Sequence, residues 1–165
     1  LLPDGEVMER VDAILRHPVF TTALAELHML ERERIFCRHG LEHLLDVARL
    51  MYIYDREAGL GIAQETLYAA ALLHDIGRAA QYRDGTPHDE AGVHLARPIL
   101  EDCGFTAQEI MEILTAIGGH RVPGETAPLG RLLYRADKKS RPCYACSAAG
   151  VCNWPEEKKN HSLEF

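Results

Sequence analysis

Apolar residues recur along most of the chain at the three- and four-residue spacing that is typical of amphipathic helices. In residues 5–16, for example, Val7, Val11 and Ile14 lie on one side of such a helix. The same pattern predicts further helices over residues 19–32, 39–57, 64–80, 88–103, 106–117 and 129–139. No alternating strand pattern is longer than a few residues. We therefore expect an all-α fold, a compact bundle of about six to seven helices.

Local signals refine these helices. Residues 67–73 are apolar on nearly every side, which predicts that the helix over 64–80 is central and buried. Thr106 and Glu109 have the spacing of a capping box and predict a helix start. Pro98 lies inside the helix over 88–103 and is expected to kink or split it. After residue 140 the sequence is rich in Cys, Pro, Lys and Glu, so we expect an irregular appendage over 141–165.

The bulk composition narrows the class of protein. The 165 residues suit one domain, and 47% apolar with 26% charged residues is typical of a globular chain. A net charge of −7 disfavours binding to extended nucleic acid, but it leaves a small phosphorylated ligand open. No apolar run reaches the roughly 18 residues that span a membrane. The start, Leu1 to Asp4, lacks the blocks of a signal peptide, so we expect a cytoplasmic protein without a membrane partner.

The histidines and aspartates are placed unusually. His39 and His43 are four residues apart, which predicts a shared helix face. His74 and Asp75 end an otherwise apolar helix, and Asp137 ends another apolar stretch. Burying such ionisable groups is costly unless they have partners.

These residues, in this order, resemble the H…HD…D signature of the HD-domain metal-dependent phosphohydrolases. The segment H-L-L-D-V-A at 43–48 resembles the family's H-x-x-x-V-A element. The segment A-A-L-L-H-D-I-G-R at 70–78 resembles A-x-L-L-H-D-I-G-K/R, and R-A-D-K at 135–138 resembles the A-D-K element. The resemblance covers about residues 36–140, within a single HD-type domain expected over residues 1–140.

The resemblance implies a metal site formed by His43, His74, Asp75 and Asp137. Two imidazoles and two carboxylates form a mixed N/O set suited to Mn, Fe, Mg, Ni, Co or Zn. Four protein ligands leave room for water and a phosphate oxygen, and such an ion lowers the pKa of bound water. This chemistry is that of phosphate-ester hydrolysis.

His88 and His120 are candidates for a second metal or for phosphate binding. The segment H-D-E-A-G at 88–92 resembles the family's H-x-x-x-G element, and in two-metal members these histidines help to bind the second ion beside a bridging aspartate. The sequence departs from the cyclic-dinucleotide phosphodiesterases, because Gly119 precedes His120 where that group has paired histidines. Otherwise the two histidines orient the phosphate or donate a proton to the leaving group.

Charged residues near the motif are the remaining candidates in this part of the chain. Asp75 and Arg78 are predicted to be catalytic, with Arg78 and Lys138 binding the substrate phosphate. The alternatives are a salt bridge of Arg78 at a helix end and an ion pair of Lys138 with a carboxylate. His39 is a candidate for a substrate-side position or a surface position.

Three cysteines, Cys143, Cys146 and Cys152, form a C-x2-C-x5-C cluster in the appendage. Two thiolates at C-x2-C spacing converge on a metal, so a structural zinc or iron–sulfur site is a candidate. A fourth ligand would come from Cys37, Cys103, His161 or another chain. Reduced thiols and a disulfide are the alternatives.

The sequence therefore predicts a hydrolase that cleaves a phosphoester or phosphoanhydride of a small phosphorylated molecule, expected to be a nucleotide, with one or two divalent ions. A di-iron HD-type oxygenase would need His88 and His120 as additional ligands and would show iron absorption. A non-catalytic module that senses a nucleotide or a redox change is the third hypothesis, favoured only by degenerate ligands.

Overall fold

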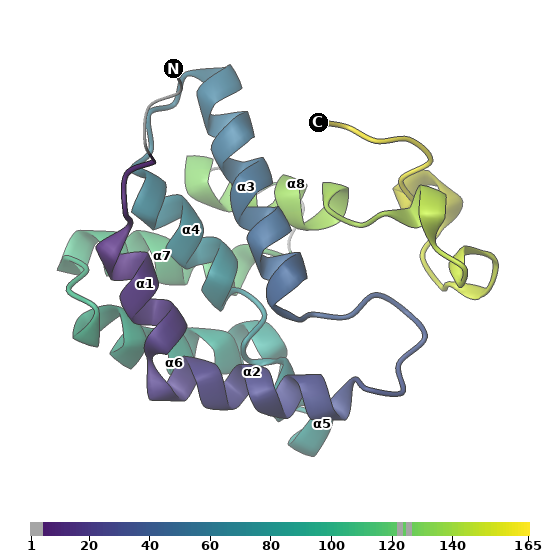
Figure 1. The fold of residues 1–165 in the computed structure, drawn as a ribbon, viewed down its shortest axis with the longest axis horizontal. Coiled ribbons are helices and arrows are strands. Elements are labelled where there is room, and N and C mark those ends of the chain that lie inside the picture. Colours follow the sequence, from purple (N-terminus) through teal and green to yellow (C-terminus); the bar gives the residue numbers. More distant parts are fainter. Residues whose placement is uncertain (1–4, 122–123, 125–126) are drawn as a thin grey trace.

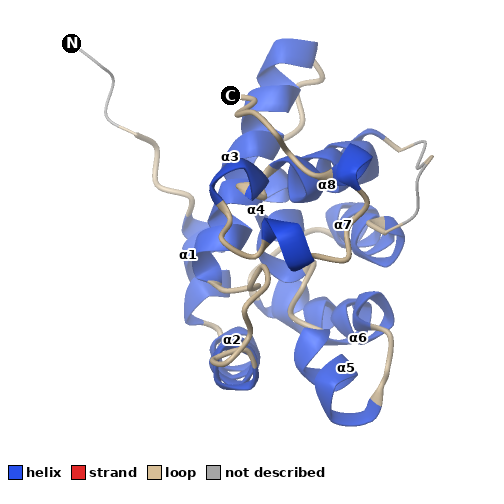
Figure 2. Ribbon diagram, turned by 90° about the vertical axis from the view of Figure 1, so that its right-hand side faces the viewer, coloured by secondary structure: helices blue, strands red, loops and turns tan. Residues whose placement is uncertain are grey.

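The computed structural model describes residues 5–121, 124 and 127–165 and is helical throughout its main body (Figures 1 and 2). The helices are α1 (Glu9–Arg16), α2 (Pro18–Leu30), α3 (Leu41–Ala58), α4 (Gln64–Leu73), α5 (Arg78–Asp84), α6 (His88–Asp102), α7 (Ala107–Gly119) and α8 (Pro128–Lys139). Three 3-10 turns follow, η1 (Cys143–Ala145), η2 (Ala149–Val151) and η3 (Glu156–Lys158). No strand occurs in these ranges, which confirms the all-α prediction. No helix in them is long and apolar enough to cross a membrane. The start of the chain, Leu1 to Asp4, lies outside the described residues.

Helix α4 forms the centre of the molecule, as its apolar sequence predicts. Its side chains from Leu67 to Leu73 are buried except for Tyr68, which is partly exposed. Helices α1, α3, α7 and α8 pack around it, and α3 also crosses and contacts α8 (Figure 1). Burial of this many apolar side chains supplies most of the stability of such a bundle.

The helix predicted over 64–80 is in fact two helices. Helix α4 ends at Leu73, and residues 74–77 form turns before α5 begins at Arg78. Gly77 lies so close to α6 that a Cβ atom there would be 2.1 Å from His88 O and 2.4 Å from Gly92 N. Only glycine permits this approach, which brings the start of α6 against the turn.

Other boundaries also differ from the sequence prediction. Helix α3 begins at Leu41, so His39 lies in the loop before it and does not share a helix with His43. Helix α6 continues through Pro98 without a break. The capping box of Thr106 and Glu109 is present at the start of α7, as predicted.

The segment after α8 folds back onto the helical body. The buried Arg141 guanidinium donates from Nη1 to Arg38 O at 2.7 Å, and Asn160 Nδ2 donates to Lys138 O and Arg141 O, each at 2.8 Å. The segment consists of short turns, and these buried hydrogen bonds attach it to α8 and to the loop before α3.

Candidate metal centre

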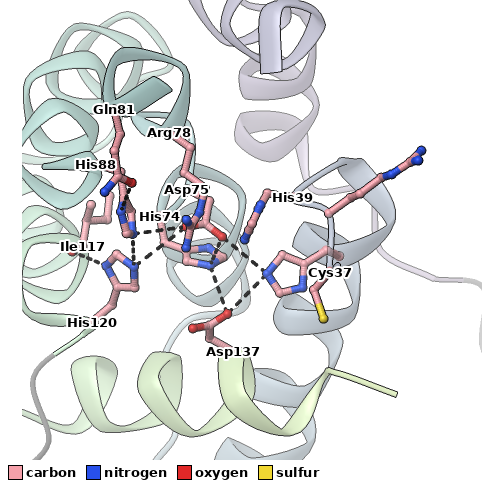
Figure 3. Close-up of polar contacts among 12 residues, drawn as sticks. Cys37, His39, His74, Asp75, Arg78, Gln81, His88, Ile117, His120 and Asp137 are labelled. Atoms are coloured by element: carbon pink, nitrogen blue, oxygen red, sulfur yellow. Dashed lines mark hydrogen bonds and ion pairs between the residues drawn. The ribbon is translucent and has the colours of Figure 1, made fainter. Parts of the chain in front are cut away.

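Four side chains from three parts of the chain meet at one buried point (Figure 3). His43 lies in the first turn of α3, Asp137 in the last turn of α8, and His74 and Asp75 directly follow α4. His43 Nε2 is 3.4 Å from Asp75 Oδ2 and 3.3 Å from Asp137 Oδ1. His74 Nε2 is 3.0 Å and 3.7 Å from the same two oxygens. The structure thus brings together the four residues that the sequence predicts as metal ligands.

The atoms that face this point lack ordinary partners. His43 Nε2, His74 Nε2 and Asp75 Oδ2 are buried without a hydrogen bond to any part of the chain that the structure describes. Leaving such atoms unpaired is costly, and native proteins rarely do so. A divalent ion would satisfy them together, so the residues present fit a metal ion of the predicted kind.

Each histidine ring at the site is oriented through its Nδ1 atom. The acceptors are Ala71 O for His74 at 2.6 Å, Ile117 O for His120 at 2.6 Å, Gln81 Oε1 for His88 at 2.9 Å and Ser140 Oγ for His43 at 3.3 Å. Ser140 donates its own proton to Asp137 O at 2.8 Å, so its oxygen accepts from His43. With hydrogen on Nδ1, each ring points its Nε2 atom into the site, as a metal ligand must.

Asp75, His88 and His120 form a second group beside the first (Figure 3). His88 Nε2 and His120 Nε2 are 3.5 Å and 3.9 Å from Asp75 Oδ1, and they are 3.2 Å from each other. The two oxygens of Asp75 therefore face different groups. Two Nε2 lone pairs at this separation repel unless a cation or a proton lies between them, so this group can hold a cation.

The electrostatics of the first group favour a positive charge. Burial alone would raise the pKa of Asp75, but the charges of His74 and Arg78 hold it well below its ordinary value. Burial alone would lower the pKa of His74, but Asp75 and Asp137 raise it to about 10. Two ionised carboxylates at one buried point stabilise a cation there.

The second group differs in its electrostatics. Burial, with a further contribution from the charge of Arg78, lowers the pKa of His88 to about 3. Burial also lowers the pKa of His120. Neutral imidazoles are the form that binds metals, and they are poor proton donors at neutral pH.

Arg78 and Lys138 both pair with carboxylates of the site. Arg78 Nε donates to Asp75 Oδ1 at 2.8 Å. Arg78 is the first residue of α5, so this ion pair does not lie at a helix C-terminus. Lys138 Nζ donates to Asp137 Oδ2 at 2.7 Å. The ion-pair alternatives for both residues are thus present, and both side chains also line the cavity described below.

Sequence reasoning missed the residues that orient the histidines. Glu31 accepts from His39 N at 2.8 Å and pairs with His39 Nδ1, and Tyr82 donates to the same carboxylate at 3.0 Å. Gln81 and Ser140 hold the ring nitrogens of His88 and His43. Ser140 lies three residues after Asp137, a spacing that could have suggested it, whereas Glu31 and Gln81 have no periodic signal.

A cavity of about 390 Å³ opens beside the metal centre. His39, His88 and Asp137 form part of its wall. Among the described residues, its cationic side chains are Arg34, Arg78, Arg121, Lys138, Arg141 and Lys159. Phe36 and Trp154 add aromatic surface. The cavity is therefore strongly positive although the chain carries a net charge of −7.

The HD-domain family model matches residues 40–141. The match covers more than half of the chain, so the protein belongs to the HD-domain family. A crystal structure from an uncultured Thermotogales bacterium, described as a predicted HD superfamily hydrolase, has the same fold. Its TM-score is 0.59 at 24% sequence identity, over 92% of this chain and 87% of that one.

Relatives among known sequences agree with this placement. An uncharacterised protein of Clostridium beijerinckii is 38% identical over 158 residues, which are 96% of this chain and all of that protein. Ribonuclease Y of Oleidesulfovibrio alaskensis is 31% identical over 126 residues, and Ribonuclease Y 1 of Pediococcus pentosaceus is 29% identical over 113 residues. These matches cover 75% and 59% of this chain but only 22% and 21% of the two ribonucleases.

Proposed function

We propose that the protein is a metal-dependent phosphohydrolase that cleaves a phosphoester or phosphoanhydride bond of a small nucleotide. The observation that carries the proposal is the set of buried, unpartnered donor atoms of His43, His74 and Asp75 at the wall of a cationic cavity. Membership of the HD-domain family supports the same reading.

His43, His74, Asp75 and Asp137 would hold the principal ion. A second ion would be held by Asp75, His88 and His120, because Asp75 presents one oxygen to each group. Bound divalent ions supply Lewis-acid activation of a phosphate and of a water molecule. The protein holds the ligand atoms in place through the Nδ1 hydrogen bonds and excludes bulk solvent from the buried carboxylates.

The cavity supports a small phosphorylated substrate. Its volume of about 390 Å³ lies within the range of about 300–1,000 Å³ typical of small-molecule sites. Arg78 and Lys138, predicted as phosphate-binding residues, reach the cavity next to the metal ligands. Phe36 and Trp154 supply aromatic surface to the cavity, which suits a nucleobase.

The roles of the remaining side chains follow from their contacts. Arg78 carries its charge beside Asp75, where it can stabilise negative charge on a transferred phosphoryl group. His88 and His120 act as neutral ligands and not as proton donors, because both pKa values are lowered. His39, held by Glu31, lies at the cavity wall and is positioned to contact the substrate.

The two ribonucleases among the relatives act, by their names, on RNA, so a phosphodiester of a nucleotide is included in the proposed substrate class. The net charge of −7 argues against an extended RNA. Since the chain spans only about a fifth of those proteins, their activity is a guide to the bond cleaved and not to the substrate's size.

The test is a hydrolysis screen with protein reconstituted separately with each candidate metal. Nucleoside mono-, di- and triphosphates, cyclic nucleotides, short oligoribonucleotides and non-nucleotide phosphates would be compared by product analysis. We expect turnover of at least one mononucleotide or dinucleotide, lost in His74→Ala and kept in His28→Ala, which changes an exposed histidine on α2. Cleavage of non-nucleotide phosphates alone would contradict the nucleotide assignment. No phosphate release by metal-loaded protein would contradict the hydrolase and favour the sensing module.

A further inference from the structure

Four of the five cysteines line the cavity. Cys143 begins η1 and Cys146 directly follows it, while Cys152 directly follows η2. Cys37 comes from the loop between α2 and α3, over 100 positions earlier in the chain. In Figure 3, Cys37 lies on the opposite side of the site from His88 and His120. Cys37 thus lies at the side of the site away from the second metal group.

Specific hydrogen bonds hold the two cysteine-bearing segments together. Arg141 Nη1 donates to Arg38 O at 2.7 Å, which joins the residue after Cys37 to a residue two positions before Cys143. Arg34 Nε donates to Cys37 O at 2.8 Å. Arg141 is itself buried, so this link is partly shielded from solvent.

Tight turns hold the three cysteines of the tail, the segment over residues 141–165. Cys146 N donates to Cys143 O and Ala149 N donates to Cys146 O, each at 3.2 Å, so consecutive tight turns present the thiols. Lys159 Nζ donates to Ala149 O at 2.8 Å and closes the segment. A C-x2-C turn of this kind is a usual corner of a thiolate-ligated metal site.

The surroundings suit an anionic centre. Arg34, Arg141 and Lys159 line the same cavity as the four thiols. Burial raises the pKa of Cys37, the charge of Arg141 opposes this, and the other three thiols raise it further. The thiols of Cys143, Cys146 and Cys152 thus all act on Cys37, and a bound metal would replace their protons.

The other candidates for a fourth ligand do not line this cavity. Cys103 follows α6 directly and belongs to the hydrophobic core. His161 lines a separate, smaller pocket with Cys143, but it is exposed and its Nε2 is 3.1 Å from Glu156 O. Cys37 is the candidate that lines the same cavity as Cys143, Cys146 and Cys152.

We propose that Cys37, Cys143, Cys146 and Cys152 together ligate an iron–sulfur cluster at the edge of the cavity. A single zinc with bonds of about 2.3 Å would bring its four sulfurs to about 3.8 Å from one another. Among the described residues, the groups of three or more with donor atoms within 4.8 Å of one another both lie at the His–Asp centre, so no three of the four sulfurs are that close together. A cluster places iron and sulfide between the thiolates, so it can join sulfurs that are too far apart to ligate one zinc ion.

The proposal is tested on the full chain purified without oxygen. Iron, zinc and acid-labile sulfide would be measured together with the visible absorption spectrum. We expect iron and sulfide in nearly equal amounts, up to about four of each per chain, beyond any ion at the His–Asp centre. His74→Ala should keep the sulfide, which separates cluster iron from iron bound by histidine.

Single substitutions identify the ligands. Cys37→Ser and Cys146→Ser should each lose most of the sulfide and the visible absorption, whereas Cys103→Ser should keep both. Circular dichroism would verify that the helices persist. If a variant does not fold, alkylation of the wild-type chain provides the answer. Cys37, Cys143, Cys146 and Cys152 should be protected as purified and should react once a chelator removes the iron, as mass spectrometry can show.

Two results would overturn the proposal. Absence of sulfide from the chain purified without oxygen would exclude the cluster, and zinc that is kept in His74→Ala but lost in Cys146→Ser would replace it by a zinc site. Full iron and sulfide in Cys37→Ser would exclude Cys37 from the ligand set. The measurements need no substrate, so a failed search for hydrolysis would not affect them. Absence of a cluster would likewise leave the proposed hydrolase function unaffected.

Discussion

Helices and helix ends hold every ligand of the His–Asp centre, whereas a loop and single 3-10 turns hold Cys37, Cys143, Cys146 and Cys152. The His–Asp ligands are buried, and each histidine ring has an Nδ1 partner. The four cysteines are half-buried thiols in free form.

This contrast distinguishes two ways of building a metal site. Helices that are already packed hold their ligands at fixed separations, so the His–Asp centre is preorganised before an ion binds. Turns without a core of their own depend on a ligand for local order, as in small metal-bound domains. We therefore expect the helical centre to survive loss of its metal and the cysteine segment to lose order without one.

Removal of the central carboxylate is the strongest way to test preorganisation. Asp75→Ala removes the residue shared by both ligand groups, so both should lose metal while the helices stay folded. Loss of several kcal/mol of transition-state stabilisation corresponds to roughly a 1,000-fold fall in kcat/KM. Elemental analysis, circular dichroism and the hydrolysis assay measure these effects. Asp46→Ala, an exposed position on α3, is the control, and retained metal and activity in Asp75→Ala would refute the assignment.

Gly77→Ala tests whether helix packing itself forms the second ligand group. The new Cβ would meet backbone atoms of His88 and Gly92, so α6 must move away from the turn. Overpacking of this kind costs about 1–3 kcal/mol, and the displacement should also weaken metal binding at His88. Urea denaturation and metal titration provide the readouts. Gly5→Ala, which meets nothing within 4 Å, should be neutral, and an equally neutral Gly77→Ala would contradict the proposed packing.

Ser140→Ala tests the orientation of a single ligand ring. The change removes the Nδ1 acceptor of His43 without touching a donor atom of the site. Loss of such a partner typically costs about 10–100-fold in metal affinity, and the 3.3 Å separation places the expected effect near tenfold. Competition with a chromophoric chelator measures the affinity. The exposed Ser162→Ala provides the baseline, and equal affinities in the two variants would show that this hydrogen bond does not matter.

Glu31→Gln is expected to act on the acid stability of the loop that carries Cys37 and His39. Burial alone would raise the pKa of Glu31, but His39 lowers it from 4.5 to about 2. The unfolded chain binds more protons in this interval, so the stability from Glu31 is complete above about pH 4.5 and is lost towards pH 2.

Urea unfolding over this pH range should show a shallower fall for Glu31→Gln than for the wild type, by up to about 1.4 kcal/mol per pH unit. Glu33→Gln, at a largely exposed side chain, should follow the wild type. Identical pH profiles for all three proteins would show that the contact between Glu31 and His39 does not stabilise the fold.

The sequence by itself determined the all-helical class, the central position of α4 and the identity of the four residues that meet at the first metal group. Helix periodicity and the cost of burying His74 and Asp75 are local properties, so they can be read from neighbouring residues. The order of His43, His74, Asp75 and Asp137 along the chain indicated the family, which the match over residues 40–141 then showed.

Only the tertiary structure decided how the centre is completed. The break at residues 74–77 depends on Gly77 meeting α6, and the ring orientation of His88 depends on Gln81. Likewise, only folding brings Cys37 to the cavity that Cys143, Cys146 and Cys152 also line. These contacts join residues from different elements, and their geometry follows from how the helices and the tail pack, which no local sequence pattern encodes.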